Sequence, residues 1–394
     1  MSRRVFIAGV GMIPFVKPGA NEPYPAMGAR AGQLALADAG IGYEAVQQAY
    51  AGYVYGDSTS GQRALYGLGM TGIPVVNVNN NCSTGSTALY LARQAIEGGA
   101  ADCVLALGFE QMKPGALGTV FDDRPSPFEK FDALAADLVG MPELPLALRY
   151  FGGAGLAHMR NHGTPLEAFA AIRAKASRHA ARNPLALLRQ ELTTEDVMNA
   201  PMLWPGVLTR LMACPPTCGA AAAVLVSEDF ARRQGLRTDV SIRAQAMTTD
   251  TPDTFDSRDM MALVGYGMSQ AAARQVYEAA GVGPAELDVV ELHDCFAHNE
   301  LISYEALGLC AEGEAAAFIA DGRNTYGGQV VTNPSGGLLS KGHPLGATGL
   351  AQCFELTHQL RGTAEARQVQ GARLGLQHNL GLGGACVVTL YQAH

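Results

Sequence analysis

The sequence is poor in charged residues and has no block of like charge. Only 16% of its 394 residues are charged, and the formal net charge at pH 7 is −8. Because nucleic-acid phosphates require a basic surface, this balance argues against a nucleic-acid partner. No apolar run approaches the length of a membrane span, so we expect no membrane-spanning segment. The chain ends in Gln392-Ala393-His394, which is not a peroxisomal targeting tripeptide.

Cysteine is sparse, and its spacing is not that of a zinc site or a disulfide scaffold. Among the eight cysteines, Cys214 and Cys218 come closest to a ligand pair, but no second pair complements them. We therefore expect no bound metal. We also expect a reducing, intracellular compartment, which would be the cytoplasm if the source is a bacterium.

The chain does contain enough apolar residues for a large core, since 48% of it is hydrophobic. Its 47 glycines punctuate an alternation of strand and helix patterns. The order strand, helix, glycine stop, strand occurs twice, at 5–10, 24–39, 40–42 and 49–55, and again at 241–246, 270–280, 281–283 and 289–292. This recurrence predicts a duplicated α/β unit with halves at 1–239 and 240–394.

The repeat continues into the next elements of each half. Cys82-x-x-Gly85 opens a helix that stops at a glycine pair and precedes the strand 103–107. His343-x-x-Gly346 opens a helix that stops at Gly362 and precedes strands at 373–377 and 385–391. We expect two mostly parallel or mixed sheets with helices on their faces. A pseudo-twofold arrangement would bring the two helix starts, and so Cys82 and His343, close together.

Cys82 lies between a buried strand pattern at 75–78 and the helix that follows. At a helix start, unpaired N–H groups and the macrodipole favour an anion, so the thiol could be held as a nucleophilic thiolate. The alternative is a buried structural cysteine beside capping hydroxyls. Pairing with the His343 imidazole would favour the first interpretation.

Residues 113–218 have no counterpart in the second half and are interpreted as an insertion, or loop domain, with a helix at 166–181. This helix and the residues after it are basic, without an acid between Ala168 and Gln190. One interpretation is a solvated helix face, and the other is a cradle for a phosphorylated cofactor arm. Its candidate contacts are Arg173, Lys175, Arg178 and Arg182.

Three further polar, glycine-rich stretches follow predicted strands, where open α/β sheets place their ligands. They are residues 291–300, residues 333–349 and residues 378–384. Asn81-Cys82-Ser83-Thr84-Gly85, the stretch 342–349 and the terminal glycine loop resemble the thiolase superfamily. His293-Asp294-Cys295-Phe296 narrows the resemblance to the sterol-carrier-protein-type thiolases. It covers the chain from Val5 to Tyr391.

The resemblance implies a thiolase fold, with duplicated βαβαβ-type halves in five layers (αβαβα) and an inserted loop domain. It implies coenzyme A (CoA) as co-substrate, bound along the loop domain, without a metal, nicotinamide or flavin. It also implies an acyl-CoA substrate and a homodimer or homotetramer. The activity would be that of a 3-ketoacyl-CoA thiolase, an acetyl-CoA or propionyl-CoA C-acyltransferase, in lipid or sterol side-chain degradation such as fatty acid β-oxidation.

The resemblance also implies roles for individual residues. Cys82 would attack the 3-keto carbon, His343 would take its proton, and Cys295 would protonate the enolate and later deprotonate CoA. His293 and His343 would hold the enolate oxygen. The backbone N–H groups of Cys82 and Gly381 would hold the oxygen of the tetrahedral intermediate.

The last loop departs from other thiolases, which place the acid/base cysteine there in a Cys-x-Gly motif. Asn379-Leu380-Gly381 occupies that place here, so the acid/base role is assigned to Cys295. Asn379, His378 and Asp294 are expected to support the reacting groups.

Two alternatives remain, a thiolase-like aldolase of steroid side-chain catabolism and a non-catalytic acyl-CoA or lipid carrier. The presence of Cys82, Cys295 and His343 together argues against the aldolase, because an aldolase needs no acyl-enzyme. The chain ends at the thiolase boundary without a lipid-transfer domain, which argues against the carrier.

Overall fold

The computed structural model describes residues 3–115, 118, 120–140 and 143–394. Its strands are β1 Val5–Met12, β2 Gln48–Gly52, β3 Val75–Val78, β4 Cys103–Glu110, β5 Met202–Trp204, β6 Leu208–Thr209, β7 Gly219–Ser227, β8 Val240–Thr248, β9 Val289–Glu291, β10 Val331–Thr332, β11 Leu374–Gly381 and β12 Ala385–Ala393. Its helices are α1 Tyr24–Ala39, α2 Ser60–Leu65, α3 Thr84–Glu97, α4 Glu129–Val139, α5 Leu146–His162, α6 Leu166–Ala181, α7 Thr194–Met198, α8 Glu228–Gln234, α9 Asp253–Asp256, α10 Met260–Leu263, α11 Tyr266–Ala280, α12 Ala297–Ala306, α13 Ala315–Ala320 and α14 Thr348–Arg361. No helix in these described ranges is long and apolar enough to cross a membrane.

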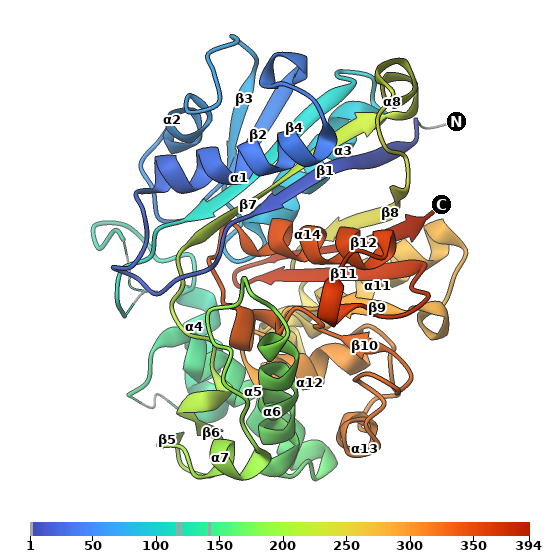
Figure 1. Ribbon diagram of the computed structural model, residues 1–394. Helices are drawn as coiled ribbons and strands as arrows, with labels where there is room; N and C mark the ends of the chain where they lie inside the picture. The colour runs from blue at the N-terminus through green and yellow to red at the C-terminus, as the bar shows by residue number, and fades with distance from the viewer. Residues whose placement is uncertain (1–2, 116–117, 119, 141–142) are drawn as a thin grey trace.

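Ten strands form one sheet in the order β10-β9-β11-β12-β8-β1-β7-β4-β2-β3. Each half contributes five strands, seen in blue to yellow-green above and in yellow to red below in Figure 1. In the first half β1, β7 and β4 are antiparallel neighbours, and β4, β2 and β3 are parallel. In the second half β8, β12 and β11 are antiparallel, and β11, β9 and β10 are parallel.

The two halves therefore repeat the same order of strands and the same senses of pairing, which confirms the predicted duplication. The expectation of two separate sheets is wrong in one respect. The edge strands β1 and β8 pair with each other at Phe6 and Ser241, and this contact joins the halves into one sheet.

Helices alternate with the two halves of the sheet to make five layers. α1 packs on β1, β7 and β4, α3 and α14 pack between the halves, and α11 packs on β8 and β12. The two central helices approach closely at their starts. A Cβ on Gly85 would lie 2.7 Å from the carbonyl oxygen of Gly346, and one on Gly349 would lie 2.3 Å from the backbone nitrogen of Ser86. Only glycine permits this approach, which brings the two helix starts together.

The described part of the insertion between β4 and β7 is mainly helical, and the green helices α4 to α7 lie below the strands of the second half in Figure 1, with α12 beside α5 and α6. α6 has the bounds predicted from the sequence, and it contacts α12 and the π-helical turn Gly337–Lys341. Residues 116–117, 119 and 141–142 of the predicted insertion lie outside the described residues.

Candidate active site

Cys82 lies in a tight turn between β3 and α3, directly before Ser83, the residue that caps the helix. Asn81 has φ 50°, a left-handed conformation that asparagine tolerates better than most residues. The Thr84 hydroxyl donates to the Asn81 carbonyl at 2.6 Å and stabilises the turn. Gly381 packs against it so closely that a Cβ would lie 2.2 Å from the Asn80 carbonyl oxygen. The turn therefore holds Cys82 beside the end of β11.

The two halves of the molecule bring Cys82, His293 and His343 together. One ligand atom from each of the three side chains lies within 4.8 Å of the others. The two imidazole rings are nearly perpendicular, with centroids 5.1 Å apart. The predicted proximity of Cys82 and His343 is confirmed. A thiol and two imidazoles can also bind zinc, but a cation there would occupy the thiol.

Hydrogen bonds orient the His343 ring. Its Nδ1 lies 2.7 Å from the Thr348 hydroxyl, which itself donates to the Pro344 carbonyl at 3.0 Å. Because that hydroxyl gives its hydrogen to Pro344, it accepts one from Nδ1. His343 Nε2 is buried and has no hydrogen-bond partner among the described residues. The neutral ring is thus protonated on Nδ1, and its Nε2 is a free acceptor.

Burial makes both members of the Cys82 and His343 pair neutral. It raises the pKa of the Cys82 thiol to about 12, and the nearby Glu110 carboxylate adds to the shift. Burial likewise lowers the pKa of His343 to about 3, with a further contribution from Lys341. The expected thiolate is therefore wrong for the resting site, because desolvation outweighs the effect of the helix start.

His293 is buried beside this pair and is held from three sides. Its backbone N–H donates to His378 Nδ1 at 3.4 Å, and its carbonyl accepts from the Asn299 amide. Asn379 Nδ2 lies 3.0 Å from His293 Nδ1 and 3.1 Å from the Cys82 carbonyl oxygen. Asn379 therefore links the backbone of Cys82 to the His293 ring, and His378 supports the segment that carries it.

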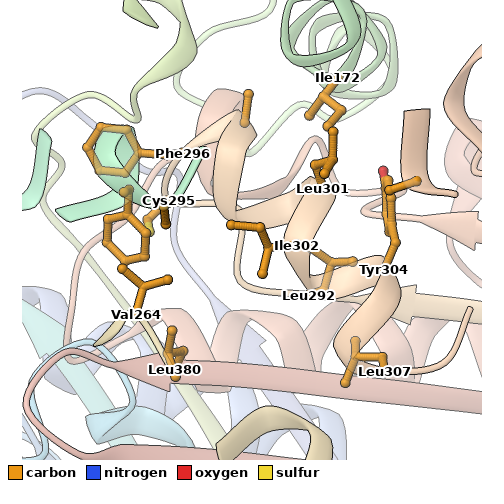
Figure 2. Packing of buried hydrophobic residues seen from close by; sticks show 14 of the residues in the cluster. Ile172, Val264, Leu292, Cys295, Phe296, Leu301, Ile302, Tyr304, Leu307 and Leu380 are labelled. Atoms are coloured by element: carbon orange, nitrogen blue, oxygen red, sulfur yellow. The ribbon is translucent and has the colours of Figure 1, made fainter. Parts of the chain in front are cut away.

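Cys295 follows His293 by two residues and lies among apolar side chains at the start of α12, as Figure 2 shows beside Val264 and Phe296. It is 4% exposed. This burial raises the pKa of its thiol well above the ordinary value, and the neighbouring Cys214 and Cys82 add to the shift. The Cys295 carbonyl accepts from the Cys214 backbone N–H at 2.9 Å.

Asp294 supports the segment that leads to His343. Its carboxylate accepts from the backbone N–H groups of Leu338 and Leu339, at 2.7 and 3.3 Å. A Cβ on Gly337, which has φ 59°, would lie 2.1 Å from Asp294 Oδ2. This contact fixes the π-helical turn just before His343.

Comparison with known proteins identifies the family. The thiolase N-terminal domain matches residues 5–122, and the thiolase C-terminal domain-like family matches residues 249–391. Sterol carrier protein 2 from Homo sapiens is 55% identical over 394 residues, which cover 99% of this chain and 72% of that protein. The chain belongs to the thiolase family. The resemblance carried by the cysteine and histidine motifs is confirmed.

Two solved structures share the fold of this thiolase. The "Ltp2-ChsH2(DUF35) aldolase" has a TM-score of 0.83 at 24% identity, covering 99% of this chain and 98% of that one. Human mitochondrial 3-ketoacyl-CoA thiolase in complex with CoA has a TM-score of 0.72 at 20% identity, covering 100% and 98%. At these identities the likeness shows the fold alone, and it confirms the predicted fold class.

The thiolase site also contains an acid that the sequence reasoning missed. Glu110 ends β4, and its carboxylate accepts from the backbone N–H groups of Val54, Tyr55 and Gly346 at 2.9 to 3.1 Å. Burial raises its pKa to about 7. Glu110 thus ties the first half to the loop after His343. Its signal in the sequence is a lone acid at the end of an otherwise apolar strand.

The basic segment of the thiolase does not form one charged face. Arg173 and Lys175 are 3% and 2% exposed. The Arg173 guanidinium donates to Ser340, and the Lys175 ammonium pairs with Glu300 and donates to Thr332 Oγ1 at 2.6 Å. The prediction that these two residues bind cofactor phosphates is wrong, because both are occupied in the interior. Two of the four predicted contacts, Arg178 and Arg182, are exposed.

Proposed function

We propose that this thiolase is a 3-ketoacyl-CoA thiolase of the sterol-carrier type, an acetyl-CoA or propionyl-CoA C-acyltransferase of lipid or sterol side-chain degradation. The convergence of Cys82, His293 and His343 within 4.8 Å carries the proposal. It supplies a nucleophile, a base and a hydrogen-bond donor around one point, as carbon–carbon cleavage through an acyl-enzyme requires.

In the first step, Cys82 Sγ attacks the 3-keto carbon while His343 Nε2 takes the thiol proton. His343 has the form that this step needs, because Nδ1 bonds to Thr348 and Nε2 is free. The protonated ring can then donate from Nε2 to the enolate oxygen, together with His293. The backbone N–H groups of Cys82 and Gly381 would stabilise the oxygen of the tetrahedral intermediate.

Cleavage of the bond between C2 and C3 leaves an acyl group on Cys82 and releases the enolate of acetyl-CoA, or of propionyl-CoA from a 2-methyl substrate. Cys295 gives its thiol proton to C2 of the enolate. Its thiolate then removes the thiol proton of CoA, and the CoA thiolate attacks the acyl group and displaces Cys82, which takes its proton back from His343. The raised pKa of Cys295 suits both steps, because it keeps the resting thiol protonated and makes the thiolate a strong base.

Thiolysis assays test this assignment directly. Acetoacetyl-CoA, a long straight-chain 3-ketoacyl-CoA and a 2-methyl-branched one would each be incubated with CoA and the wild type, Cys82→Ala or Cys310→Ala. We expect thiolysis by the wild type, an unchanged rate in Cys310→Ala, and loss of turnover in Cys82→Ala. Equal thiolysis by Cys82→Ala and the wild type would remove the nucleophile assignment.

The aldolase that shares the fold defines the alternative function. An aldolase cleaves the carbon–carbon bond without CoA and without an acyl-enzyme, so mass spectrometry of quenched reactions separates the two functions. An acyl adduct on Cys82 with a 3-ketoacyl-CoA supports the thiolase. Aldehyde or ketone release from a 3-hydroxyacyl-CoA, with no adduct, supports the aldolase.

The exposed Arg178 and Arg182 remain our proposed contacts for the CoA phosphates, because they lie on one end of α6 in the inserted loop domain. Arg182 also stacks on Tyr326, with its guanidinium carbon 4.6 Å from the ring centroid. We keep the proposal that the protein needs no resident metal, since zinc at Cys82 would block the nucleophile. We also keep the proposal of a homodimer or homotetramer.

A further inference from the structure

A buried chain of polar side chains leads from the C-terminal strand to His293. The Tyr391 hydroxyl bonds to Gln377 Oε1, Gln377 Nε2 lies 2.7 Å from Ser86 Oγ, and Ser86 Oγ lies 2.8 Å from Asn379 Oδ1. Asn379 Nδ2 completes the chain at His293 Nδ1, 3.0 Å away. All five side chains are at most 1% exposed. The proposed chemistry assigns no role to Tyr391, Gln377 or Ser86.

Two backbone carbonyl oxygens determine the direction of every hydrogen bond in this chain. Gln377 Nε2 lies 2.8 Å from the Gly349 carbonyl oxygen, and Asn379 Nδ2 lies 3.1 Å from the Cys82 carbonyl oxygen. Because a carbonyl oxygen can only accept, both amide atoms must be nitrogens. Ser86 therefore accepts from Gln377 and donates its own hydrogen to Asn379 Oδ1.

The contact with Asn379 also determines the protonation of His293. Asn379 Nδ2 carries only hydrogens toward the ring, so His293 Nδ1 must accept. Burial, together with His343 and His378, lowers the pKa of His293 well below its ordinary value, so the ring is neutral. A neutral imidazole has a single N–H, which must then be on Nε2. His343, whose Nδ1 donates to Thr348, is the opposite tautomer.

We propose that Asn379, oriented by Ser86 and Gln377, is a positioning residue that holds His293 as the Nε2–H tautomer, so that this ring donates where His343 accepts. The inference rests on the proposed function, in which His293 holds the enolate oxygen. With the other tautomer, a nitrogen lone pair would meet the developing negative charge and repel it. Asn379, which stands where other thiolases have the cysteine of the Cys-x-Gly motif, would thus position His293.

The tautomer can be measured without any assay of activity. In protein with ¹⁵N-labelled histidine, we expect the His293 signal to show a protonated Nε2 and an unprotonated Nδ1. A His293→Gln variant identifies the signal by its loss. A wild-type protein that is active in thiolysis but has the proton of His293 on Nδ1 would overturn the tautomer assignment. A wild type with the expected tautomer but no thiolysis would overturn the proposed function instead.

Asn379→Asp tests the consequence for catalysis. A carboxylate can only accept, so it draws the proton of His293 to Nδ1 and removes the donor at Nε2. We expect kcat to fall by roughly 10²–10³, the usual loss for one such donor, with little change in KM. Acid should restore part of the lost rate, because a protonated ring donates from both nitrogens. A wild-type pH profile in this variant, with the tautomer unchanged, would contradict the proposal.

Ser86→Ala is a milder change to the same chain of hydrogen bonds and is compared with Asn379→Asp. It removes the hydroxyl that donates to Asn379 Oδ1 but leaves the contact of Asn379 with the Cys82 carbonyl. We expect a smaller fall in kcat than in Asn379→Asp and no recovery in acid, since His293 keeps its tautomer. A loss as large as that of Asn379→Asp, with the same recovery in acid, would show that the Cys82 carbonyl does not orient the amide.

Discussion

Cys82 and His343, the proposed reactive pair of this thiolase, are two neutral groups and not a preformed ion pair. Cys82 keeps its proton because burial raises its pKa to about 12, and His343 stays neutral because burial lowers its pKa to about 3. In the proposed first step, the proton therefore moves from sulfur to nitrogen as the thiol attacks. A substrate that brings its own polar groups into the site would assist this transfer.

Alkylation of Cys82 by iodoacetamide at different pH values would show this state. Since only the thiolate reacts, the rate should rise by about tenfold per pH unit below the pKa. We expect the rise to continue without levelling from pH 7 to 10, as measured by mass spectrometry of the Cys82 peptide. The urea-unfolded chain is the control and should level off above about pH 8.5. Levelling at or below pH 8 in the folded protein would instead indicate a stabilised thiolate.

At the scale of elements, the segment before His343 depends on buried charges. Lys341 and Glu291 form an ion pair at 3.3 Å, with side chains that are 1% and 0% exposed. The Glu291 carboxylate also accepts from the Ser335 hydroxyl at 2.8 Å. Together with Asp294, this pair fixes the π-helical turn Gly337–Lys341 and so the approach to His343. Partners from other segments therefore position the turn, in addition to its own hydrogen bond from the Ser340 N–H to the Gly336 carbonyl.

Lys341→Met should destabilise the protein by about 3–5 kcal/mol, because it leaves the buried Glu291 carboxylate without its counter-charge. Urea unfolding would measure this loss. Adding Glu291→Gln to Lys341→Met should restore a large part of the lost stability, since neither position of the pair then carries a buried charge. The exposed Lys17 offers a matched control, and Lys17→Met should change stability by less than about 0.5 kcal/mol. A loss no greater than that of the control would show that the pair is not needed.

At the scale of the whole molecule, the two ends of the ten-stranded sheet differ. β10 is short and buried at one end, whereas β3 at the other end has no further strand beside it in the described part of the chain. Val76 on β3 is 45% exposed, and Tyr66 and Met70, which follow α2, are 50% and 77% exposed. An open, apolar strand edge invites pairing with another chain. We therefore propose that the expected oligomer forms through β3.

Val76→Lys should weaken that oligomer, because it places a charge on the edge that pairs. Light scattering coupled to size-exclusion chromatography would show a shift toward the monomer, while circular dichroism stays unchanged. Val120, which is 64% exposed in the insertion, provides the matched control. Val120→Lys should leave the oligomer intact. An unchanged mass in Val76→Lys would place the interface elsewhere.

Local signals were sufficient for much of the fold. The bounds of α1 and α6 follow from a proline at each start, and α1 stops at Gly40, which adopts the left-handed conformation with φ 73°. The repeat predicted the duplicated α/β unit and the meeting of Cys82 with His343, because a duplicated unit places equivalent elements in equivalent positions. These features depend on residues that are neighbours along the chain, or on a comparison of the chain with itself.

The protonation states and partners at the site were decided by the tertiary structure alone. Glu110 reaches Gly346 across 236 residues, and Asn379 reaches the Cys82 carbonyl across 297. Lys175 resembles a surface cation in its sequence context, yet the structure buries it against Glu300. The sequence by itself determined which elements form and which reactive residues meet. Burial and distant hydrogen bonds decided which of them carry protons, because desolvation depends on every segment that surrounds a group.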